Sequence, residues 1–241
     1  MGTMLQVTAL KAWYGAAQIL FDLAFDVRAG EVVTLMGRNG AGKSTTLKAI
    51  MGLVERREGV VRLHDADISA LAPYQIARLG IGFTPEDRRI FSDLTVLENL
   101  DVGRQPPRRF PDGTPAPLFT AARLFALFPA LEERRNHLGQ ELSGGEQQML
   151  TVARTLMGNP LLVLLDEPSQ GVAPLIVEQM ADTIVELKKQ GLAILLSEQN
   201  LGFAQFVSDR VYVLEKGHIQ WQGKMADLIA DSDVQRALLT L

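Results

Sequence analysis

Cysteine is absent from the 241-residue sequence, and histidine occurs only three times. The absence of cysteine excludes a disulfide framework and sulfur-ligated metal, and it is compatible with a reducing cytoplasm. The three histidines, His64, His137 and His218, fall in segments that have the patterns of strands or loops. We expect each of them to have a structural role rather than a catalytic or metal-binding one.

Long apolar runs and an excess of positive charge are absent as well. No run approaches the ~20 residues needed to cross a bilayer, so a role in transport requires another chain to span the membrane. The N-terminal residues MGTMLQVTALKAWYG lack a basic segment followed by an apolar core, so we expect no signal peptide. The net charge of −4 and the pI of about 5.5 provide no polycationic surface, and we expect no nucleic-acid partner.

The apolar residues that are present, 47% of the chain, are enough for a substantial core in one α/β domain or in a core with a subdomain. Short apolar segments alternate with helical patterns, which predicts a parallel sheet with one helical insertion. The predicted strands are 4–9, 19–27, 32–36, 60–63, 81–84, 161–165 and 193–196. The predicted helices are 43–51, 73–79 and 174–189, and 95–158 is predicted to be mainly helical apart from an exposed proline-rich loop at 105–117.

The segment GRNGAGKST, residues 37–45, matches the phosphate-loop pattern GxxxxGK[ST] between a predicted strand and a predicted helix. Its glycines free the backbone N–H groups to turn inward around a phosphate; Lys43 would bridge β- and γ-oxygens, and Ser44 would ligate Mg²⁺. The alternative, a glycine-rich turn before a helix, is disfavoured by the spacing and the context. The predicted nucleotide-binding residues here are Gly37, Arg38, Asn39, Gly40, Ala41, Gly42, Lys43, Ser44 and Thr45.

Two adjacent carboxylates follow the apolar run at 161–165. A buried strand delivers Asp166 and Glu167 at its carboxyl edge, where open α/β sheets bind ligands. Asp166 would hold Mg²⁺, and Glu167 would act as the general base for an attacking water. Two carboxylates at a strand end are often only the start of a loop, but a preceding phosphate loop makes the catalytic interpretation the stronger one.

The segment LSGGEQQML, residues 142–150, places a serine and two glycines at the predicted start of an amphipathic helix. Free amide groups and the positive end of a helix dipole suit a phosphate. Ser143 and Glu146 also form the pattern of an ordinary capping box, which is the alternative reading. A phosphate loop, then LSGGEQQ, then an apolar strand ending in Asp-Glu is together typical of one superfamily.

With these motifs in place, the sequence resembles the ATP-hydrolysing cassettes of ABC transporters over nearly its whole length. It is similar in particular to the cassettes of branched-chain amino acid importers and to their urea- or amide-importing relatives. The resemblance implies an α/β P-loop NTPase fold with a RecA-like parallel-sheet core, an N-terminal antiparallel β-subdomain and an inserted helical subdomain. It also implies a single domain over 1–241, with the core and β-subdomain at 1–86 and 159–241 and the helical subdomain at 87–158. The segments that carry the resemblance are VTALKAWYG, GRNGAGKSTTLKAIMGL, IGFTPEDRRIFSDLTVLENL, LFPALEERR, LSGGEQQML, LLDEPSQGVAP and LSEQN.

The resemblance implies further roles. Tyr14 would stack on adenine, the alternative being a core tyrosine at a strand end. Ser143, Gly144 and Gly145 would contact the γ-phosphate of ATP held by a second cassette, which is either a different chain or a copy of this one. The implied location is the cytoplasmic face of the cell membrane, peripheral to transmembrane permease subunits that cooperate with a periplasmic or extracellular solute-binding protein.

Three positions depart from the broad superfamily pattern. Glu86 stands where most cassettes have a glutamine that senses Mg²⁺ and the membrane subunit, and we expect it to approach Mg²⁺ as a carboxylate. Gln199 stands at the place of a switch histidine; it can donate a hydrogen bond to the γ-phosphate but cannot become cationic. Ala173 replaces a common aspartate in the loop that links the two sites. Glu86 and Gln199 are both similar to the branched-chain subfamily.

The predicted function is therefore an ATPase subunit, with ATP and Mg²⁺, that powers solute uptake in an ABC importer, in which Lys43, Glu86, Glu167 and Gln199 take part in catalysis. Alternatives within transport are urea or amide uptake and export of lipid or lipopolysaccharide. A non-transport ABC ATPase usually carries a coiled-coil insertion or a second cassette, neither of which is present here. A small-molecule kinase is disfavoured by LSGGEQQ.

Overall fold

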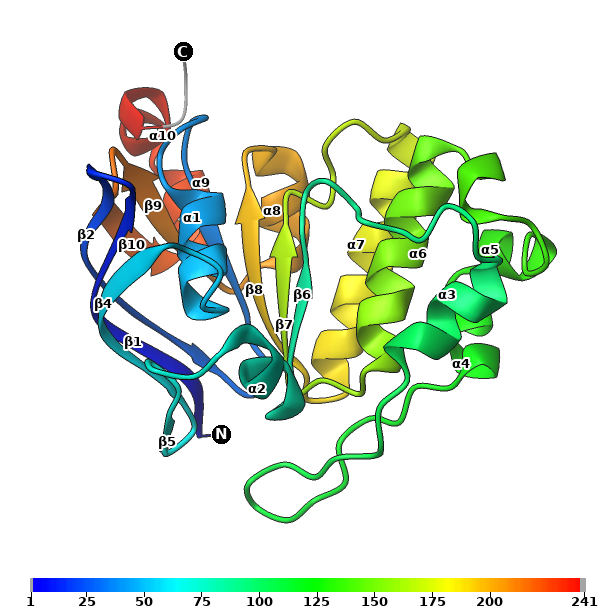
Figure 1. Cartoon of the computed structure of the whole chain (residues 1–241). Helices are drawn as coiled ribbons and strands as arrows, with labels where there is room; N and C mark the ends of the chain where they lie inside the picture. The colour runs from blue at the N-terminus through cyan, green and yellow to red at the C-terminus, as the bar shows by residue number, and fades with distance from the viewer. Residues whose placement is uncertain (1, 239–241) are drawn as a thin grey trace.

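Two β-sheets form the centre of the described residues, 2–238, of the computed structural model (Figure 1). The smaller sheet is antiparallel, with the strand order β2 (Ala17–Arg28), β1 (Thr3–Tyr14), β4 (Arg56–Leu63) and β5 (Ala66–Asp67). The larger sheet has the order β10 (His218–Lys224), β9 (Arg210–Glu215), β3 (Val32–Met36), β8 (Ala193–Glu198), β7 (Leu162–Asp166) and β6 (Ile81–Thr84). Its neighbours pair in parallel except β10, which is antiparallel to β9.

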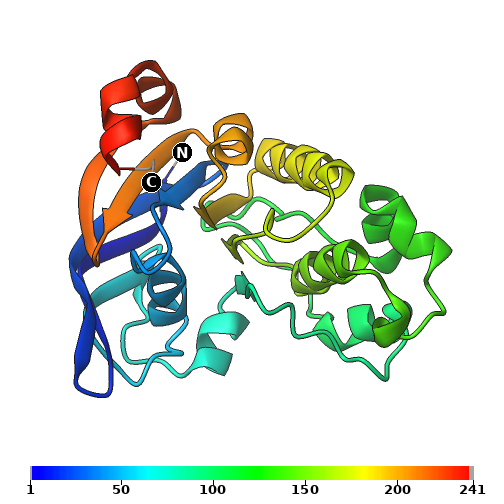
Figure 2. The ribbon, with the colours of Figure 1, turned by 90° about the horizontal axis from the view of Figure 1, so that it is seen from above.

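The larger sheet is covered on both faces, and this is why its central strands are continuous apolar runs. Every residue of β3, β7 and β8 is buried, as expected of covered parallel strands. Because successive side chains point to opposite faces, Leu162 and Leu164 pack with α1 (Lys43–Ile50) and the smaller sheet. Val163 and Leu165 pack instead with α6 (Gly144–Met157) and α7 (Pro174–Lys189). Helices α1 and α6 therefore cover opposite faces of the sheet (Figure 1 and Figure 2).

Helices dominate the segment between β6 and β7. They are α3 (Val96–Gly103), α4 (Ala121–Leu127), α5 (Pro129–Glu133), a short 3-10 helix (Gly139–Glu141) and α6. Their buried residues share one apolar cluster with α7 and one face of the larger sheet. The proline-rich segment 105–117 is a loop, as predicted. The predicted limits of a helical subdomain at 87 and 158 stay a prediction.

The remaining helices lie elsewhere in the chain: α2 (Pro73–Arg78) before β6, α8 (Leu201–Val207) after β8, and α9 (Met225–Ala230) and α10 (Ser232–Leu238) after β10. Within residues 2–238, no helix combines the length and the apolar character needed to cross a membrane.

Each strand and helix predicted from the sequence coincides with an observed one, but four strands were predicted too short. Strands β1 and β4 extend well beyond 4–9 and 60–63, and β2 and β8 extend by one or two residues at an end beyond 19–27 and 193–196. The missed residues include polar side chains, which interrupt the apolar pattern. Strand β10, whose residues alternate exposed and half-buried positions, was not predicted for the same reason. Strand β9 and helices α8 to α10 also lie beyond 196, where no element had been predicted.

A charged cluster around Arg210 joins the two sheets. The guanidinium of Arg210, on β9, donates to Glu31 Oε1 at 2.6 Å and to Asp26 Oδ2, on β2, at 3.0 Å. The Arg210 side chain is only 21% exposed. Hydrogen bonds to Glu31, and less strongly to Asp26, raise the pKa of Arg210 although desolvation opposes them. Bidentate pairs of this kind are stronger than isolated surface ion pairs.

We predict that Arg210→Ala lowers the free energy of unfolding by about 2 kcal/mol or more, because two partly buried carboxylates lose their cation. Arg104→Ala is the matched control, since its ion pair with Asp101 involves side chains that are 64% and 49% exposed; we expect a change within about 0.5 kcal/mol. Urea unfolding of the three proteins tests this. Equal losses in the two variants would contradict the role assigned to Arg210.

Candidate functional site

The predicted phosphate loop connects β3 to α1 at the carboxyl edge of the larger sheet. Gly42 is the N-cap of α1 with a φ of +107°, and a Cβ at this position would lie 2.8 Å from Leu20 Cδ2. A Cβ on Gly37 would lie 2.3 Å from the carbonyl oxygen of Leu214. Both positions therefore require glycine. No side chain caps α1, so the first amide groups of the helix are available to an anion.

Lys43 lies at the centre of the site and is only 4% exposed. Its ammonium donates to the carbonyl oxygens of Gly37 at 2.8 Å and Arg38 at 3.3 Å, and it pairs with Glu167 Oε1 at 3.1 Å. Glu167 is 6% exposed. The structure thus brings together two charged residues that are 124 positions apart in the sequence. They meet because strands β3 and β7, which precede them, both end at this edge of the sheet. A buried ammonium beside free backbone amides is suited to bind phosphate oxygens.

Asp166 also lies at this edge and is buried. Its Oδ1 accepts hydrogen bonds from Ser44 Oγ at 2.8 Å and from Ser197 Oγ at 2.5 Å. Its Oδ2 is buried without a hydrogen-bond partner among the described residues. Burial is the main cause that raises the pKa of Asp166. A partnerless carboxylate oxygen next to a serine hydroxyl fits a hard cation such as Mg²⁺, which takes oxygen ligands.

Within residues 2–238, no group of three or more His, Cys, Asp or Glu side chains is placed to hold a metal. Mg²⁺ does not need such a group, because it commonly binds through one or two carboxylates together with waters and substrate phosphates. Ser44 and Asp166 are therefore the residues of the predicted metal set whose geometry fits the ion directly.

Glu167 is held in an unusual conformation. Its φ is +47°, a left-handed backbone that costs a non-glycine residue roughly 1–3 kcal/mol. Its N–H donates to the carbonyl oxygen of Ser197 at 3.0 Å, and its Oε2 accepts from Gln199 Nε2. The carboxylate is thus fixed between the Lys43 ammonium and the Gln199 amide, which orients it for a general-base role.

Glu86 follows β6 and is exposed. Partial desolvation raises its pKa, and the negative charges of Glu167 and Asp166 raise it further. Because such repulsion acts between nearby charges, Glu86 lies near Asp166 and Glu167. The structure therefore gathers five of the predicted catalytic and metal residues by direct contacts and Glu86 by charge alone; the five are Lys43, Ser44, Asp166, Glu167 and Gln199.

The Ser143–Gly145 segment begins α6, on the face of the sheet opposite α1. The predicted capping box is present: Ser143 N–H donates to Glu146 Oε2 at 2.7 Å, and Glu146 N–H donates to Ser143 Oγ at 3.3 Å. Because α6 runs antiparallel to the following β7, its N-terminus lies toward the same carboxyl edge as the phosphate loop. The fold thus presents the two motifs on opposite faces of one edge, and does not stack one over the other.

Tyr14 ends β1 at the hairpin with β2 and is 39% exposed. This exposure does not fit the alternative of a core tyrosine, and the ring is accessible to a ligand. The neighbouring Gly15 N–H donates to Glu55 Oε2 at 2.7 Å, which fixes the turn.

Sequence reasoning missed Ser197 and Glu198, although both stand beside Gln199 at the end of β8. Ser197 binds both Asp166 and the backbone of Glu167. The Glu198 carboxylate, 1% exposed, accepts from the N–H groups of Ser169, Gln199 and Asn200, and burial raises its pKa. Polar residues directly after an apolar strand, adjacent in the sheet to Asp-Glu, were the signal available in the sequence. Ala173, the third departure from the family pattern, is the N-cap of α7 and makes no side-chain cap bond.

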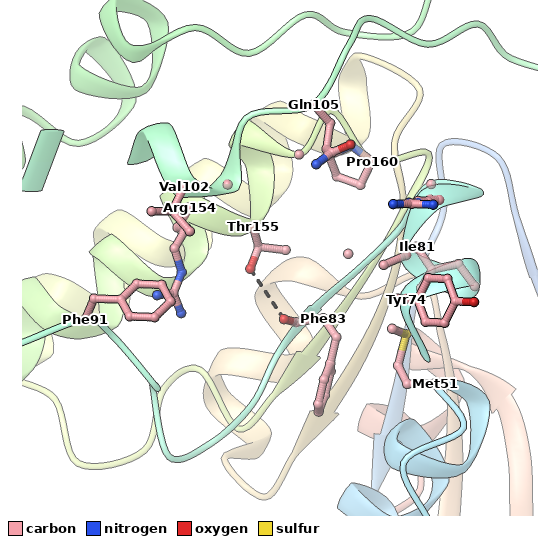
Figure 3. A pocket seen from close by; sticks show the side chains of 16 residues that line it. Met51, Tyr74, Ile81, Phe83, Phe91, Val102, Gln105, Arg154, Thr155 and Pro160 are labelled. Carbon is pink, nitrogen blue, oxygen red and sulfur yellow. Dashed lines mark hydrogen bonds between the residues drawn. The ribbon is translucent and has the colours of Figure 1, made fainter. Parts of the chain in front are cut away.

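A separate cleft of about 510 Å³ lies between α2 and β6 on one side and α3 and α6 on the other. Figure 3 shows aromatic and aliphatic side chains around it. At its centre, the Thr155 hydroxyl donates a hydrogen bond to the carbonyl oxygen of Phe83. The guanidinium of Arg154 lies 5.0 Å from the ring centre of Phe91. Three large apolar residues of this cleft are more than 40% exposed: Tyr74 at 61%, Phe91 at 46% and Val102 at 54%.

Comparison with known proteins agrees with this arrangement. The sequence model of the ABC transporter family matches residues 20–170. The chain is 40% identical, over 98% of its length and 99% of the relative, to the high-affinity branched-chain amino acid transport ATP-binding protein BraG of Pseudomonas aeruginosa. It is 35% identical to the lipopolysaccharide export system ATP-binding protein LptB of Escherichia coli K12, covering 99% of this chain and 98% of that one. A crystal structure of a nucleotide-free ATP-binding cassette from an ABC transporter superposes with a TM-score of 0.80 at 27% identity, and 97% of each chain is covered.

The chain belongs to the ABC transporter family and is an ATP-binding cassette, an ATPase of that family. The P-loop NTPase fold predicted from the sequence, with its parallel core, antiparallel sheet and inserted helices, is confirmed.

The raised pKa of Asp166 generates a prediction about pH. An acid whose pKa is higher in the folded than in the unfolded chain binds more protons when folded, so it makes stability fall as pH rises. We therefore expect Asp166→Asn to unfold at higher urea concentration than the wild type at pH 7 without nucleotide. The gain should shrink as pH falls toward 3.8, the ordinary value for aspartate. A difference that is constant with pH, or that grows on acidification, would contradict this account.

Proposed function

We propose that this chain is the ATP-hydrolysing subunit of an ABC importer for branched-chain amino acids. The observation that carries the mechanism is the buried Lys43–Glu167 pair beside the partnerless oxygen of Asp166. The similarity to BraG along almost the entire length of both chains supports the substrate class. Uptake of urea or amides remains the alternative within the same subfamily.

The binding roles follow from the contacts of the phosphate loop. Residues 37–45 would surround the β-phosphate with backbone N–H groups, and Lys43 would exchange its contacts with carbonyl oxygens for the β- and γ-oxygens. Ser44 and Asp166 would hold Mg²⁺, with Glu86 approaching the ion from the end of β6. Bound there, the ion would neutralise charge on the phosphates. Tyr14 would stack on the adenine.

Glu167 is the proposed general base. Its release from Lys43, when the ammonium turns to phosphate, would free Oε1 to accept a proton from the attacking water. Gln199 would keep Oε2 in place and donate to the γ-phosphate when the nucleotide is bound. Since glutamine cannot take up a proton as histidine does, the base function rests on Glu167 alone.

The other half of the site comes from a second cassette in this proposal. The position of α6 on the face opposite α1 supports an arrangement in which Ser143, Gly144 and Gly145 serve the nucleotide of a neighbouring cassette. ATP would then favour the closed pair, and hydrolysis would release it, because the nucleotide binds the two states with different affinity. The second cassette is a different chain or another copy of this one.

The cleft between α2, β6, α3 and α6 is the proposed contact for the membrane subunits. Its exposed apolar residues Tyr74, Phe91 and Val102 suit an apolar helix of a permease. The chain would thus lie peripherally on the cytoplasmic face of the membrane, and an external solute-binding protein would act on it only through the permease.

Lipopolysaccharide export is the second candidate, supported by the 35% identity to LptB. Gln199, where a histidine would favour the export class, weighs against it, as does the higher identity to BraG.

We predict that Glu167→Gln lowers ATP turnover at least about 100-fold, because the base is lost while the shape is kept. The variant should accumulate an ATP-bound pair, seen as a doubled mass in light scattering with Mg·ATP. Glu178→Gln, an exposed position on α7, is the control and should keep normal turnover.

The outcomes separate the parts of the proposal. Full turnover in Glu167→Gln means that another group is the base. Lost turnover without pairing of the isolated chain points to a different partner cassette.

The class of solute that the transporter carries is tested by measuring the uptake of solutes into cells. Cells that lack this chain should lose most uptake of radiolabelled leucine, and the wild-type chain but not Glu167→Gln should restore it. Unchanged leucine uptake with lost urea uptake would move the assignment to the urea-importing relatives. Defective export of lipopolysaccharide, with normal uptake of both solutes, would favour the second candidate.

A further inference from the structure

Two consecutive residues after Glu86 have a backbone that non-glycine residues rarely adopt. Arg88 has a φ of +60° and Arg89 a φ of +51°. Such a backbone is strained and persists only where surrounding contacts impose it. Strain of this kind gathers at functional sites, so the groups that impose it indicate what the loop is built to hold.

Two residues of α6 bond to this backbone, and a third bonds to the side chain of Arg88. Thr151 Oγ1 donates to the carbonyl oxygen of Arg88 at 3.0 Å, and Arg154 Nη2 donates to that of Arg89 at 2.6 Å. Arg88 Nε donates to Gln148 Oε1 at 3.2 Å. The loop is therefore fastened along α6, and the Arg88 side chain is directed toward the N-terminal end of that helix.

The guanidinium of Arg88 lies against the glycines of the α6 turn. A Cβ on Gly144 would lie 2.9 Å from Arg88 Nη1, and a Cβ on Gly171 would lie 3.9 Å from Nη2. A side chain at 144 would thus displace the guanidinium. Arg88 and Gly171 also line a cleft of about 550 Å³ that opens beside Gln147, so the guanidinium faces open space.

The Arg88 guanidinium and the neighbouring Gln148 amide have donor groups that lack acceptors within residues 2–238. Among residues 2–238, Arg88 has no carboxylate partner and its Nη groups have no hydrogen-bond partner, whereas Arg89 pairs with Asp87 at 2.8 Å. Gln148, 2% exposed, has a buried Nε2 without a partner within the same residues. A cation at the positive end of a helix dipole is unfavourable unless an anion joins it. The carboxylate in the first turn of α6, Glu146, accepts from Ser143 N–H and pairs with Arg134, and no carboxylate within residues 2–238 pairs with Arg88.

We propose that Arg88 belongs to the part of the nucleotide site that this chain presents to its partner cassette, where its guanidinium binds the γ-phosphate of the partner's ATP together with Ser143 and Gly144. This inference rests on the proposed function, which brings a triphosphate to the start of α6. A guanidinium fork suits phosphate oxygens, and the strained backbone at 88 and 89 holds it there before the partner closes.

The test uses the cassette in its transport complex, purified through a tag on this chain, and the isolated chain. Arg88→Ala should lower kcat of the complex roughly 100-fold, the lower end of what loss of one oxyanion donor costs. Affinity of the isolated chain for Mg·ATP should stay within about twofold, because that nucleotide lies on residues 37–45 across the sheet. Arg88→Lys, which keeps the charge without the fork, should fall between Arg88→Ala and the wild type.

Arg89→Ala is the matched control. It has the same left-handed backbone and an exposed side chain, so it should leave both kcat and ATP affinity within about twofold of the wild type. Should Arg88→Ala fail to fold, as judged by its melting temperature, Arg88→Lys must still lose at least about threefold in kcat.

Two results would overturn the inference. One is a kcat of Arg88→Ala within twofold of the wild type. The other is a loss in the isolated chain's own affinity for ATP that equals the loss in kcat, which would place Arg88 at the nucleotide of its own chain. Ser143→Ala, measured in parallel, separates this failure from that of the proposed function. If Ser143→Ala stops turnover and Arg88→Ala does not, only Arg88 is wrongly assigned. If Ser143→Ala is fully active, the shared site is wrong and the inference falls with it.

Discussion

The buried ion pair between Lys43 and Glu167 is the contact on which the rest of the site depends. Its two charges are almost fully removed from water, so each needs partners within the protein. The Lys43 ammonium has the carboxylate and the backbone carbonyls of residues 37 and 38, and the Glu167 carboxylate has the ammonium and the Gln199 amide. The pair holds the phosphate loop against the end of β7 in the absence of nucleotide. In the proposed mechanism a triphosphate would replace Glu167 as the partner of Lys43, and the carboxylate would then be released at the place where a base is needed. One contact would therefore link nucleotide binding to readiness for hydrolysis.

The larger sheet explains why the pair can form. Parallel strands β3, β6, β7 and β8 end at one edge. Strands β7 and β8 deliver polar residues of the site directly at the end of a buried run, whereas β3 leads into the phosphate loop and β6 is followed two residues later by Glu86. The same sheet separates α1 from α6 by covering its two faces with different helices. The part of the predicted site that would hold this chain's own nucleotide is thus assembled within the chain. The part predicted to serve a partner cassette begins α6, on the other face of the sheet. The fold favours a shared site for this reason.

Much of this was predictable from local sequence. The phosphate loop, the Asp-Glu pair and the capped start of α6 each have a pattern that is tied to a backbone conformation, and the observed elements fall where those patterns predict. The sequence signalled polar residues at Ser197 and Glu198, but their contacts were not predictable, because they arise from the pairing of β7 with β8 and register between strands is set by tertiary packing. The left-handed backbone at Arg88 and Arg89 was equally hidden, since contacts from α6 impose it on residues without turn-forming character. Long-range contacts, not propensity, decided these positions.

The central claim, that the site is shared between two cassettes, is tested most directly by a structure of the Glu167→Gln cassette trapped with Mg·ATP in its transport complex. The quantity to measure is the distance from Ser143 of this chain to each bound γ-phosphate. The account predicts hydrogen-bond distance to the nucleotide held by the partner cassette, and no contact with the nucleotide on Lys43 of the same chain. A γ-phosphate bound by Lys43 and Ser143 of one and the same chain would contradict it.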